Sequence, residues 1–434
     1  MRLCGEIAVP GDKSITHRAI ILSALASGAS DLIGWLPSED CRRTLSAVQA
    51  MGVSVLENGT SLRINGCGLS GLQEPSDMID CGNSGTTLRL LTGLLAGQSF
   101  FSALTGDDSL RKRPMRRVID PLREMGAHIH GRSDGQLAPL AITGKKLSAI
   151  SYTLPIASAQ VKSALLLAGL NASGETAVTD PYDTRDHTER MLQHFGAAVK
   201  REGNRCFITG GKPFSGKVIH VPGDFSSAAF FIVAGLIVPD AMITIKHLGI
   251  NRTRTGLLDV LERMGAKIEI SAMDNGPLTM DHDEPVADIK IAASPLKGAG
   301  TIEGEIIPRL IDEFPILCIA AAFADGETEI RGAGELRVKE SDRIATMAKA
   351  LQAIGVVAEE LPDGIRIVGK EKSVGGRCET EGDHRVAMAM KIAQLRTDGK
   401  IQLDDETCID TSFPGFNDLL KGLMGEIDAF NYCD

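Results

Sequence analysis

The chain has 434 residues, of which 43% are hydrophobic and 24% charged, a composition typical of a globular protein with two or three domains. Its net charge of −10 argues against bulk nucleic-acid binding, and no apolar run approaches the roughly 20 residues that span a bilayer. The nine cysteines form no Cys-x-x-Cys pair and no zinc-type cluster. The cysteine spacing therefore predicts no metal site. Because Glu6 and Asp12 interrupt any signal peptide, we expect a cytoplasmic protein.

A short polar stretch leads into an Ala- and Leu-rich helical segment six times along the chain. Small residues at a helix start let backbone N–H groups approach an anion. An ordinary capped core helix would begin in the same way, so a single start is not decisive. The six starts lie at residues 11–14, 82–85, 157–160, 223–226, 311–314 and 382–385.

Each start is coupled to a second helix that is predicted to end in an apolar residue followed by glycine. Successive glycines of this set are 69 to 90 residues apart, and strand-like segments such as residues 127–129 and 267–270 follow five of them. A self-similar period of this length indicates one α/β unit copied several times. Six copies predict two domains of three units each. The glycines are Gly52, Gly126, Gly196, Gly265, Gly355 and Gly425.

Four local patterns predict further structure in chain order. Residues 3–9 alternate loosely and predict an edge strand. Pro114 suits the first position of a helix, which would hold Arg113 at a helix N-terminus. Asp186 and Glu189 have the spacing of a capping box. Two polar segments are interpreted as surface loops: residues 373–381 and 396–407.

The special helix starts and the nearby loops carry far more cations than carboxylates, although the chain is acidic overall. Such segregation is typical of a cleft for small polyanions, because arginine forms paired hydrogen bonds with carboxylate and phosphate groups. The two acidic members could also be simple helix caps. The set comprises Lys13, Arg18, Arg89, Arg113, Arg185, Lys339, Arg343 and Arg385, with Asp312, Glu340, Ser14, Ser158 and Gln160.

These motifs, taken in order over the whole chain, resemble the 5-enolpyruvylshikimate-3-phosphate synthase family. The resemblance rests on Gly-Asp-Lys-Ser at 11–14, Gly-Asn-Ser-Gly-Thr at 82–86, Arg-Pro-Met at 113–115, Ser-Ala-Gln at 158–160, Arg-Asp-His at 185–187, Ile-Asp-Glu at 311–313, Lys-Glu at 339–340 with Arg343, and Asp-His-Arg at 383–385. It implies an α/β fold of two similar globular domains, each of three βαβαββ units, described as an inside-out α/β barrel. The domains would comprise residues 11–222 and residues 1–10 plus 223–434, with the two chain crossings as a hinge.

The resemblance also implies a reaction and its residues. A monomeric enzyme would transfer the enolpyruvyl group of phosphoenolpyruvate to the 5-hydroxyl of shikimate 3-phosphate and release phosphate, with no cofactor and no nucleic-acid or membrane partner. Asp312, Glu340 and Lys13 would be catalytic, as the hydroxyl base, the methylene acid and a second proton-transfer group. Shikimate 3-phosphate would bind Lys13, Ser14, Arg18, Ser158, Ala159, Gln160, Arg185, Asp312 and Lys339. Phosphoenolpyruvate would bind Lys13, Gly85, Arg113, Gln160, Arg343, His384 and Arg385.

Two positions depart from the family pattern, and two other functions stay open. Thr411 stands where many members have a lysine, and Ala159 stands where others have a second serine. The sister enzyme, UDP-N-acetylglucosamine enolpyruvyl transferase, uses a loop cysteine that residues 111–117 lack. A non-catalytic anion-binding protein on the same fold is the other alternative.

One group of motifs resembles the family's second class, whose members are often tolerant of glyphosate, a competitor of phosphoenolpyruvate. Gly85 favours only partial tolerance here, because without a Cβ atom it leaves room for the longer inhibitor. The class motifs are Gly-Asp-Lys-Ser at 11–14, Ser-Ala-Gln-Val-Lys at 158–162, Arg-Asp-His-Thr-Glu at 185–189 and Asn-Arg-Thr-Arg at 251–254.

Overall fold

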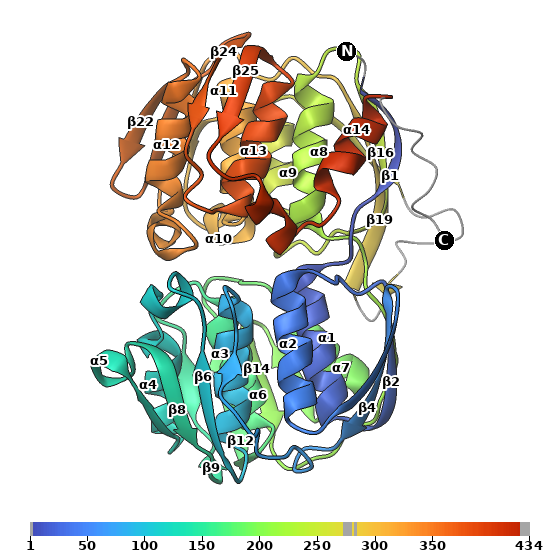
Figure 1. Ribbon diagram of the computed structural model, residues 1–434, viewed down its shortest axis with the longest axis vertical. Coiled ribbons are helices and arrows are strands. Elements are labelled where there is room, and N and C mark those ends of the chain that lie inside the picture. The colour runs from blue at the N-terminus through green and yellow to red at the C-terminus, as the bar shows by residue number, and fades with distance from the viewer. Residues whose placement is uncertain (1–2, 272–279, 282–283, 426–434) are drawn as a thin grey trace. The chain divides into compact units, whose positions relative to one another are not determined.

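The computed structural model describes residues 3–271, 280–281 and 284–425. Its chain divides into two compact units (Figure 1). The first unit comprises Gly11–Val221 with the short segment Asp281–Glu284, and the second comprises Met1–Pro10, Pro222–Met280 and Pro285–Asp434. No helix in the described residues is long and apolar enough to cross a membrane.

Three four-stranded sheets in the first unit share one topology. The first two strands of each sheet are parallel and the remaining neighbours are antiparallel. In sheet order, the strands are β15 (Val218–His220), β2 (Ser27–Ile33), β4 (Ser61–Cys67) and β3 (Ser54–Asn58); β5 (Ile79–Asp80), β6 (Phe101–Thr105), β8 (Leu137–Thr143) and β7 (His128–Gly131); and β10 (Ser151–Thr153), β12 (Glu175–Thr179), β14 (Arg205–Thr209) and β13 (Val199–Glu202). A further pair joins β9 (Leu147–Ser148) to β11 (Ala172–Ser173).

The second unit repeats this topology twice and shortens it once. Its sheets contain β1 (Cys4–Ala8), β16 (Met242–Gly249), β19 (Glu284–Ala292) and β17 (Lys267–Ser271), with β18 (Met280–Asp281) beside β19; β20 (Gly300–Ile302), β21 (Glu327–Ile330), β23 (Gly364–Val368) and β22 (Val357–Leu361); and the parallel pair β24 (Ser373–Cys378) and β25 (Thr397–Leu403). The interpretation of residues 373–381 and 396–407 as surface loops is therefore wrong. Glycines are depleted in strands, so the segment around Gly375 and Gly376 did not indicate one.

Each of the six special starts opens a helix, as predicted. These helices are α1 (Lys13–Leu25), α3 (Gly85–Ala96), α6 (Ala159–Gly169), α8 (Phe225–Ile237), α11 (Phe314–Ala322) and α13 (His384–Gln394). Their companions are α2 (Glu39–Ala50), α4 (Arg116–Glu124), α7 (His187–Phe195), α9 (Gly256–Arg263), α12 (Arg343–Ala353) and α14 (Phe416–Leu423). Shorter helical turns are α5 (Arg132–Gly135), α10 (Ile306–Leu310), η1 (Leu110–Lys112), η2 (Gly334–Val338) and η3 (Thr407–Thr411).

The companion helices end in the predicted way. The glycine that closes each of them has a positive φ, between 73° and 93°, which a side chain would strain. The strand that follows five of these glycines is also present, as β3, β7, β13, β17 and β22. The six-fold repeat of the α/β fold is thus confirmed in its helices, and its last copy keeps only two described strands.

Two central helices of the second unit, α8 and α11, are apolar on every side. All residues of α8 and α11 are buried, and α8, α11 and α13 contact one another. A helix that is hydrophobic all round needs a fully covered environment, which the surrounding sheets and companion helices provide (Figure 1). Side-chain contacts between helix starts, described below, place the N-termini of these three helices together.

The central helices of the first unit approach each other at a glycine. A Cβ atom at Gly93 of α3 would lie 2.2 Å from the carbonyl oxygen of Ala164 in α6. The clashing oxygen belongs to the backbone, so α3 and α6 would have to separate to accept a methyl group. Gly93 therefore sets how closely α3 and α6 approach each other.

We expect Gly93→Ala to lower the free energy of unfolding by about 1–3 kcal/mol, the usual cost of overpacking a core. Urea denaturation would measure the change. Gly334→Ala is the matched control, because a Cβ atom at Gly334 meets nothing within 4 Å. Equal stability of the two variants would show that α3 and α6 can separate without cost.

Candidate functional site

The start of α1 joins a capped helix to a buried ion pair. Asp12 caps the helix, because its Oδ1 accepts a hydrogen bond of 2.9 Å from the Ile15 amide. The next residue, Lys13, forms a close ion pair with Asp40 of α2, which is 6% exposed. The structure therefore holds the Lys13 ammonium group at the end of α1 through a carboxylate that the sequence analysis did not select.

Arg18 lies one turn further along α1 and is buried among hydroxyl groups. Its guanidinium donates to Thr188 Oγ1 (2.6 Å), Ser163 Oγ (2.8 Å) and the carbonyl of Ser14 (2.9 Å). Burial lowers the pKa of Arg18 to about 10; the Glu189 carboxylate opposes this shift and the Arg185 cation adds to it. Arg18 and Arg185 are thus close enough for their charges to interact, as an anion site requires.

A chain of hydrogen bonds ties α1 to the start of α3. His17 Nδ1 lies 2.7 Å from Thr44 Oγ1, which lies 2.7 Å from Thr87 Oγ1, and Thr87 bonds to the cap of α3, Ser84 (2.7 Å). Burial and the positive charge of Lys13 hold the pKa of His17 well below its ordinary value. A neutral imidazole in this chain adds no further positive charge to the helix starts.

The starts of α3 and α6 are joined through Gln160. Arg89 donates to Gln160 Oε1 (2.7 Å), and Gln160 Nε2 donates to Thr86 Oγ1 (3.0 Å). Ser158 caps α6 through the Val161 amide (3.4 Å). Ala159, the first residue of α6, has no hydroxyl group to add.

Gly85 begins α3 beside two guanidinium groups. A Cβ atom there would lie 2.9 Å from Arg89 Nη1 and 3.3 Å from Arg113 Nη1. Arg113 is buried and hydrogen-bonds to Asn83 and to Ser109 Oγ, at 3.3 Å for the latter. The helix expected to begin at Pro114 is present as α4 but begins later, at Arg116, so that Pro114 is not its first residue and Arg113 follows η1.

In the second unit, three cations surround one carboxylate. Asp312 Oδ1 lies 3.7 Å from Lys339 Nζ and 3.6 Å from Arg343 Nη1, and its Oδ2 lies 3.9 Å from Arg385 Nη2. Arg385 also donates to the backbone carbonyl of Asp312 (3.1 Å). Glu340 accepts a hydrogen bond of 2.6 Å from Arg343 Nη2. The predicted residues of this unit therefore form one charged cluster.

Asp383 holds this cluster through hydrogen bonds to two of its residues. Its Oδ2 accepts from Arg343 Nε (2.7 Å), and its Oδ1 accepts from the Arg385 amide (3.0 Å) at the start of α13. Both Asp383 and Arg343 are at most 1% exposed. Burial alone would raise the pKa of Asp383, but the Arg343 charge outweighs it and lowers that pKa below its ordinary value. His384, also buried, begins α13 beside this pair.

A second buried cluster connects the starts of α8 and α11. Arg254 Nη2 donates to Asp224 Oδ1 (2.6 Å) and to Ser226 Oγ (2.7 Å), and Ser226 hydrogen-bonds to Glu313. Glu313 is adjacent to Asp312 in sequence and is 1% exposed. The resemblance had marked Arg254 only as part of a class motif. In the structure, Arg254 is linked through Ser226 to Glu313, the residue that precedes α11.

The expected capping box of α7 is also wrong. Asp186 precedes α7 but makes no side-chain cap, and instead pairs with Arg190 (2.9 Å) and Arg201 (2.7 Å). Glu189 bonds to Lys162 of α6 at 2.8 Å. Lys162 and Arg201 are distant in sequence from the carboxylates they pair with, so the spacing of Asp186 and Glu189 could not indicate these two partners.

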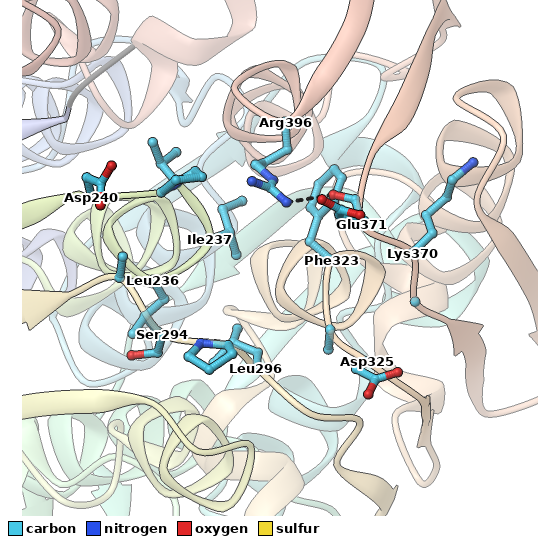
Figure 2. Close-up of a pocket in the computed structure, with 16 residues that line it drawn as sticks. Leu236, Ile237, Asp240, Ser294, Leu296, Phe323, Asp325, Lys370, Glu371 and Arg396 are labelled. Atoms are coloured by element: carbon cyan, nitrogen blue, oxygen red, sulfur yellow. Dashed lines mark hydrogen bonds between the residues drawn. The ribbon is translucent and has the colours of Figure 1, made fainter.

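One cavity in the described residues lies apart from these helix starts. Its volume is about 550 Å³, and its lining includes Ile237, Phe323 and Arg396, which lie at or just beyond the C-terminal ends of α8, α11 and α13 (Figure 2). A helix of 13 residues is about 20 Å long, so the cavity lies at the opposite ends of the helices from Asp312 and Asp383. Among the described residues, no group of His, Cys, Asp and Glu side chains is placed to hold a metal ion.

We expect Asp383→Asn to lower the free energy of unfolding by about 3 kcal/mol at neutral pH, because it removes the fully buried carboxylate that pairs with the buried Arg343. The folded pKa of Asp383 lies below the unfolded value. Its contribution is therefore present above that unfolded value, near 4, and is lost as pH falls through the folded pKa. Urea unfolding from pH 7 downward should show the difference between parent and variant narrowing at acid pH.

The control for this experiment is Asp398→Asn, which removes an exposed pair with Lys372 (3.3 Å) and should change stability by less than about 1 kcal/mol. A difference for Asp383→Asn that does not change with pH would contradict the assigned charge on Asp383.

Comparison with known proteins identifies the family. Residues 1–420 match the family described as EPSP synthase (3-phosphoshikimate 1-carboxyvinyltransferase). Proteins named 3-phosphoshikimate 1-carboxyvinyltransferase from Geobacter metallireducens and Desulforudis audaxviator are 54% and 52% identical over 417 and 426 residues, covering 96% and 98% of both chains in each case. The EPSP synthase structure from Acinetobacter baumannii has a TM-score of 0.85 and 46% identity, and covers 97% of this chain and 95% of its own. This chain belongs to the EPSP synthase family.

Proposed function

We propose that the chain transfers the enolpyruvyl group of phosphoenolpyruvate to the 5-hydroxyl of shikimate 3-phosphate and releases phosphate. The observation that carries this function is the cluster of Asp312, Glu340, Lys339, Arg343 and Arg385, in which two carboxylates lie among three cations. Such a cluster can bind anionic substrates and also move protons. A protein that only binds anions would have no need for the two carboxylates.

The proposed substrate residues come from both units. Shikimate 3-phosphate binds Lys13, Ser14, Arg18, Ser158, Gln160, Arg185, Asp312 and Lys339, beside the backbone of Ala159. Phosphoenolpyruvate binds Lys13, Gly85, Arg113, Gln160, Arg343, His384 and Arg385. Support comes from the helix starts that carry most of them, since backbone N–H groups and cations both stabilise phosphate and carboxylate groups there.

The chemistry runs by addition and elimination. Asp312 takes the proton of the 5-hydroxyl group of shikimate 3-phosphate, and the oxygen of that hydroxyl bonds to C2 of phosphoenolpyruvate. In the same step, Glu340 gives a proton to the C3 methylene. In the second step the C2–O bond to phosphate breaks, and C3 returns a proton to the Glu340 carboxylate as the double bond re-forms. Anionic groups of a bound substrate favour the protonated form of a neighbouring carboxyl group, as a general acid requires. Fixed cations stabilise the charge on the leaving phosphate.

The alternatives make different predictions. UDP-N-acetylglucosamine enolpyruvyl transferase would need the loop cysteine that residues 111–117 lack, and the family match over residues 1–420 is to EPSP synthases. Thr411 lies at the end of η3 and offers no cation in place of the lysine of other members.

We also propose a monomer that acts in the cytoplasm, with the crossings near residues 10–11 and 221–222 as its hinge. Light scattering and the radius of gyration with and without substrates would test the monomer and the hinge.

We expect Glu340→Gln to keep its affinity for shikimate 3-phosphate but to lose roughly 10²–10⁴ in kcat, the usual contribution of a general acid or base. Phosphate release with both substrates measures kcat, and calorimetry measures binding. Glu359→Gln, an exposed change on β22, should match the parent. Near-normal turnover of Glu340→Gln would remove Glu340 from the mechanism.

The proposed site predicts partial glyphosate tolerance. Gly85→Ala places a methyl group against Arg89 and Arg113, at a cost of about 1–3 kcal/mol to a ligand that fills this space. This corresponds to roughly a 5- to 150-fold loss of glyphosate affinity, with a smaller rise in the KM for the shorter phosphoenolpyruvate. Inhibition constants and KM values for parent, Gly85→Ala and the control Gly334→Ala decide the point. Equal weakening of inhibitor and substrate would show that Gly85 does not discriminate between them.

A further inference from the structure

Lys162, in the first turn of α6, belongs to a buried ionic cluster. Lys162 Nζ lies 2.8 Å from Glu189 Oε1 of α7 and 2.9 Å from Asp180 Oδ2, just after β12. All three residues are at most 4% exposed. Burial alone would lower the pKa of Lys162, but the charges of Glu189 and Asp180 outweigh it and raise that pKa. Lys162 is therefore a cation, and it is too deeply buried to contact a ligand.

The cluster holds the backbone that leads to Arg185. Lys162 Nζ donates to the carbonyl of Thr184 (3.0 Å), and Asp180 Oδ2 accepts from the amide (2.9 Å) and hydroxyl (2.6 Å) of the same residue. Asp180 Oδ1 accepts from the Tyr182 amide (3.0 Å). The carbonyl of Thr184 and the amide of Arg185 belong to one planar peptide group, so the Lys162 bond orients the residue that carries the Arg185 side chain.

The same cluster borders Arg18. Ser163, which follows Lys162, accepts a hydrogen bond from Arg18 Nη2. Thr188, which precedes Glu189, accepts one from Arg18 Nε. The charges of Lys162, Arg18, Asp180 and Glu189 sum to zero. Loss of Lys162 alone would leave an excess negative charge beside Arg18, in a place from which water is excluded.

We propose that Lys162 is a positioning residue for the acceptor site: through Asp180 and Glu189 it fixes Arg185 and Arg18 where they bind the anionic groups of shikimate 3-phosphate. This inference rests on the function proposed above and deepens it. Lys162 touches no substrate, and its effect reaches the ligand through the Thr184–Arg185 peptide and through Arg18. It should therefore act on shikimate 3-phosphate and spare phosphoenolpyruvate.

The test compares four variants with the parent enzyme. Lys162→Met removes the charge and the Thr184 bond. Lys162→Met combined with Glu189→Gln restores charge balance but still lacks that bond, so it separates positioning from folding. Lys162→Arg keeps a cation that can reach the same partners. Lys200→Met is the control, since Lys200 forms an exposed pair with Glu202 in the same unit.

We expect the dissociation constant of shikimate 3-phosphate, measured by calorimetry, to rise about 10- to 100-fold in Lys162→Met and in the charge-balanced double variant. The KM for phosphoenolpyruvate should change less than about twofold, Lys162→Arg should recover most of the affinity, and Lys200→Met should match the parent. The double variant should melt close to the parent temperature.

Parent-like affinity of the folded double variant for shikimate 3-phosphate would overturn the positioning role while leaving the enzyme's function intact. Weakening of both substrates in proportion to the loss of thermal stability would also overturn it, since that result describes a structural residue. Failure of the parent to release phosphate from the two substrates would instead overturn the proposed function. The two failures are therefore distinguishable.

Discussion

Buried carboxylates hold the cations at the helix starts of both units. In the first unit, Asp40 pairs with Lys13. Asp180 and Glu189 both pair with Lys162, whose neighbour Ser163 accepts a hydrogen bond from Arg18. In the second unit, Asp383 pairs with Arg343. A cation at a helix N-terminus is disfavoured by the helix dipole, and a buried charge without a partner is costlier still. The carboxylates remove both penalties, so the cations are in place before any anion binds.

The repeat explains why these pairs gather at helix starts. Each copy supplies one central helix, and helices such as α8 and α11 are apolar on all sides, so their bodies offer no place for charge. Polar groups can lie only at the ends of these helices. Glycine at position 93 lets α3 and α6 approach closely, and the hydrogen bond from Arg89 to Gln160 then joins their starts. Packing of the core and geometry of the site are thus set by the same contacts.

Local patterns in the sequence predict the helices well and the ionic partners poorly. Polar starts and terminal glycines are short-range signals, because a cap or a left-handed residue acts on its own helix. Asp180, by contrast, bonds to Lys162 18 residues away, and Asp383 bonds to Arg343 40 residues away. The spacing of Asp186 and Glu189 fits a capping box, yet tertiary partners take both carboxylates. Family resemblance supplied the proposed substrate-binding residues but not the carboxylates that pair with their cations.

The most direct test is a pair of crystal structures, without ligand and with shikimate 3-phosphate. Our account predicts that the phosphate ester contacts Lys13, Arg185 or the start of α6, while the bonds from Lys162 to Thr184 and from Arg343 to Asp383 are the same in both. If Arg18 or Arg343 leaves its buried partners to reach the ligand, or if the ligand binds away from these helix starts, the claim that buried carboxylates preorganise the site is contradicted.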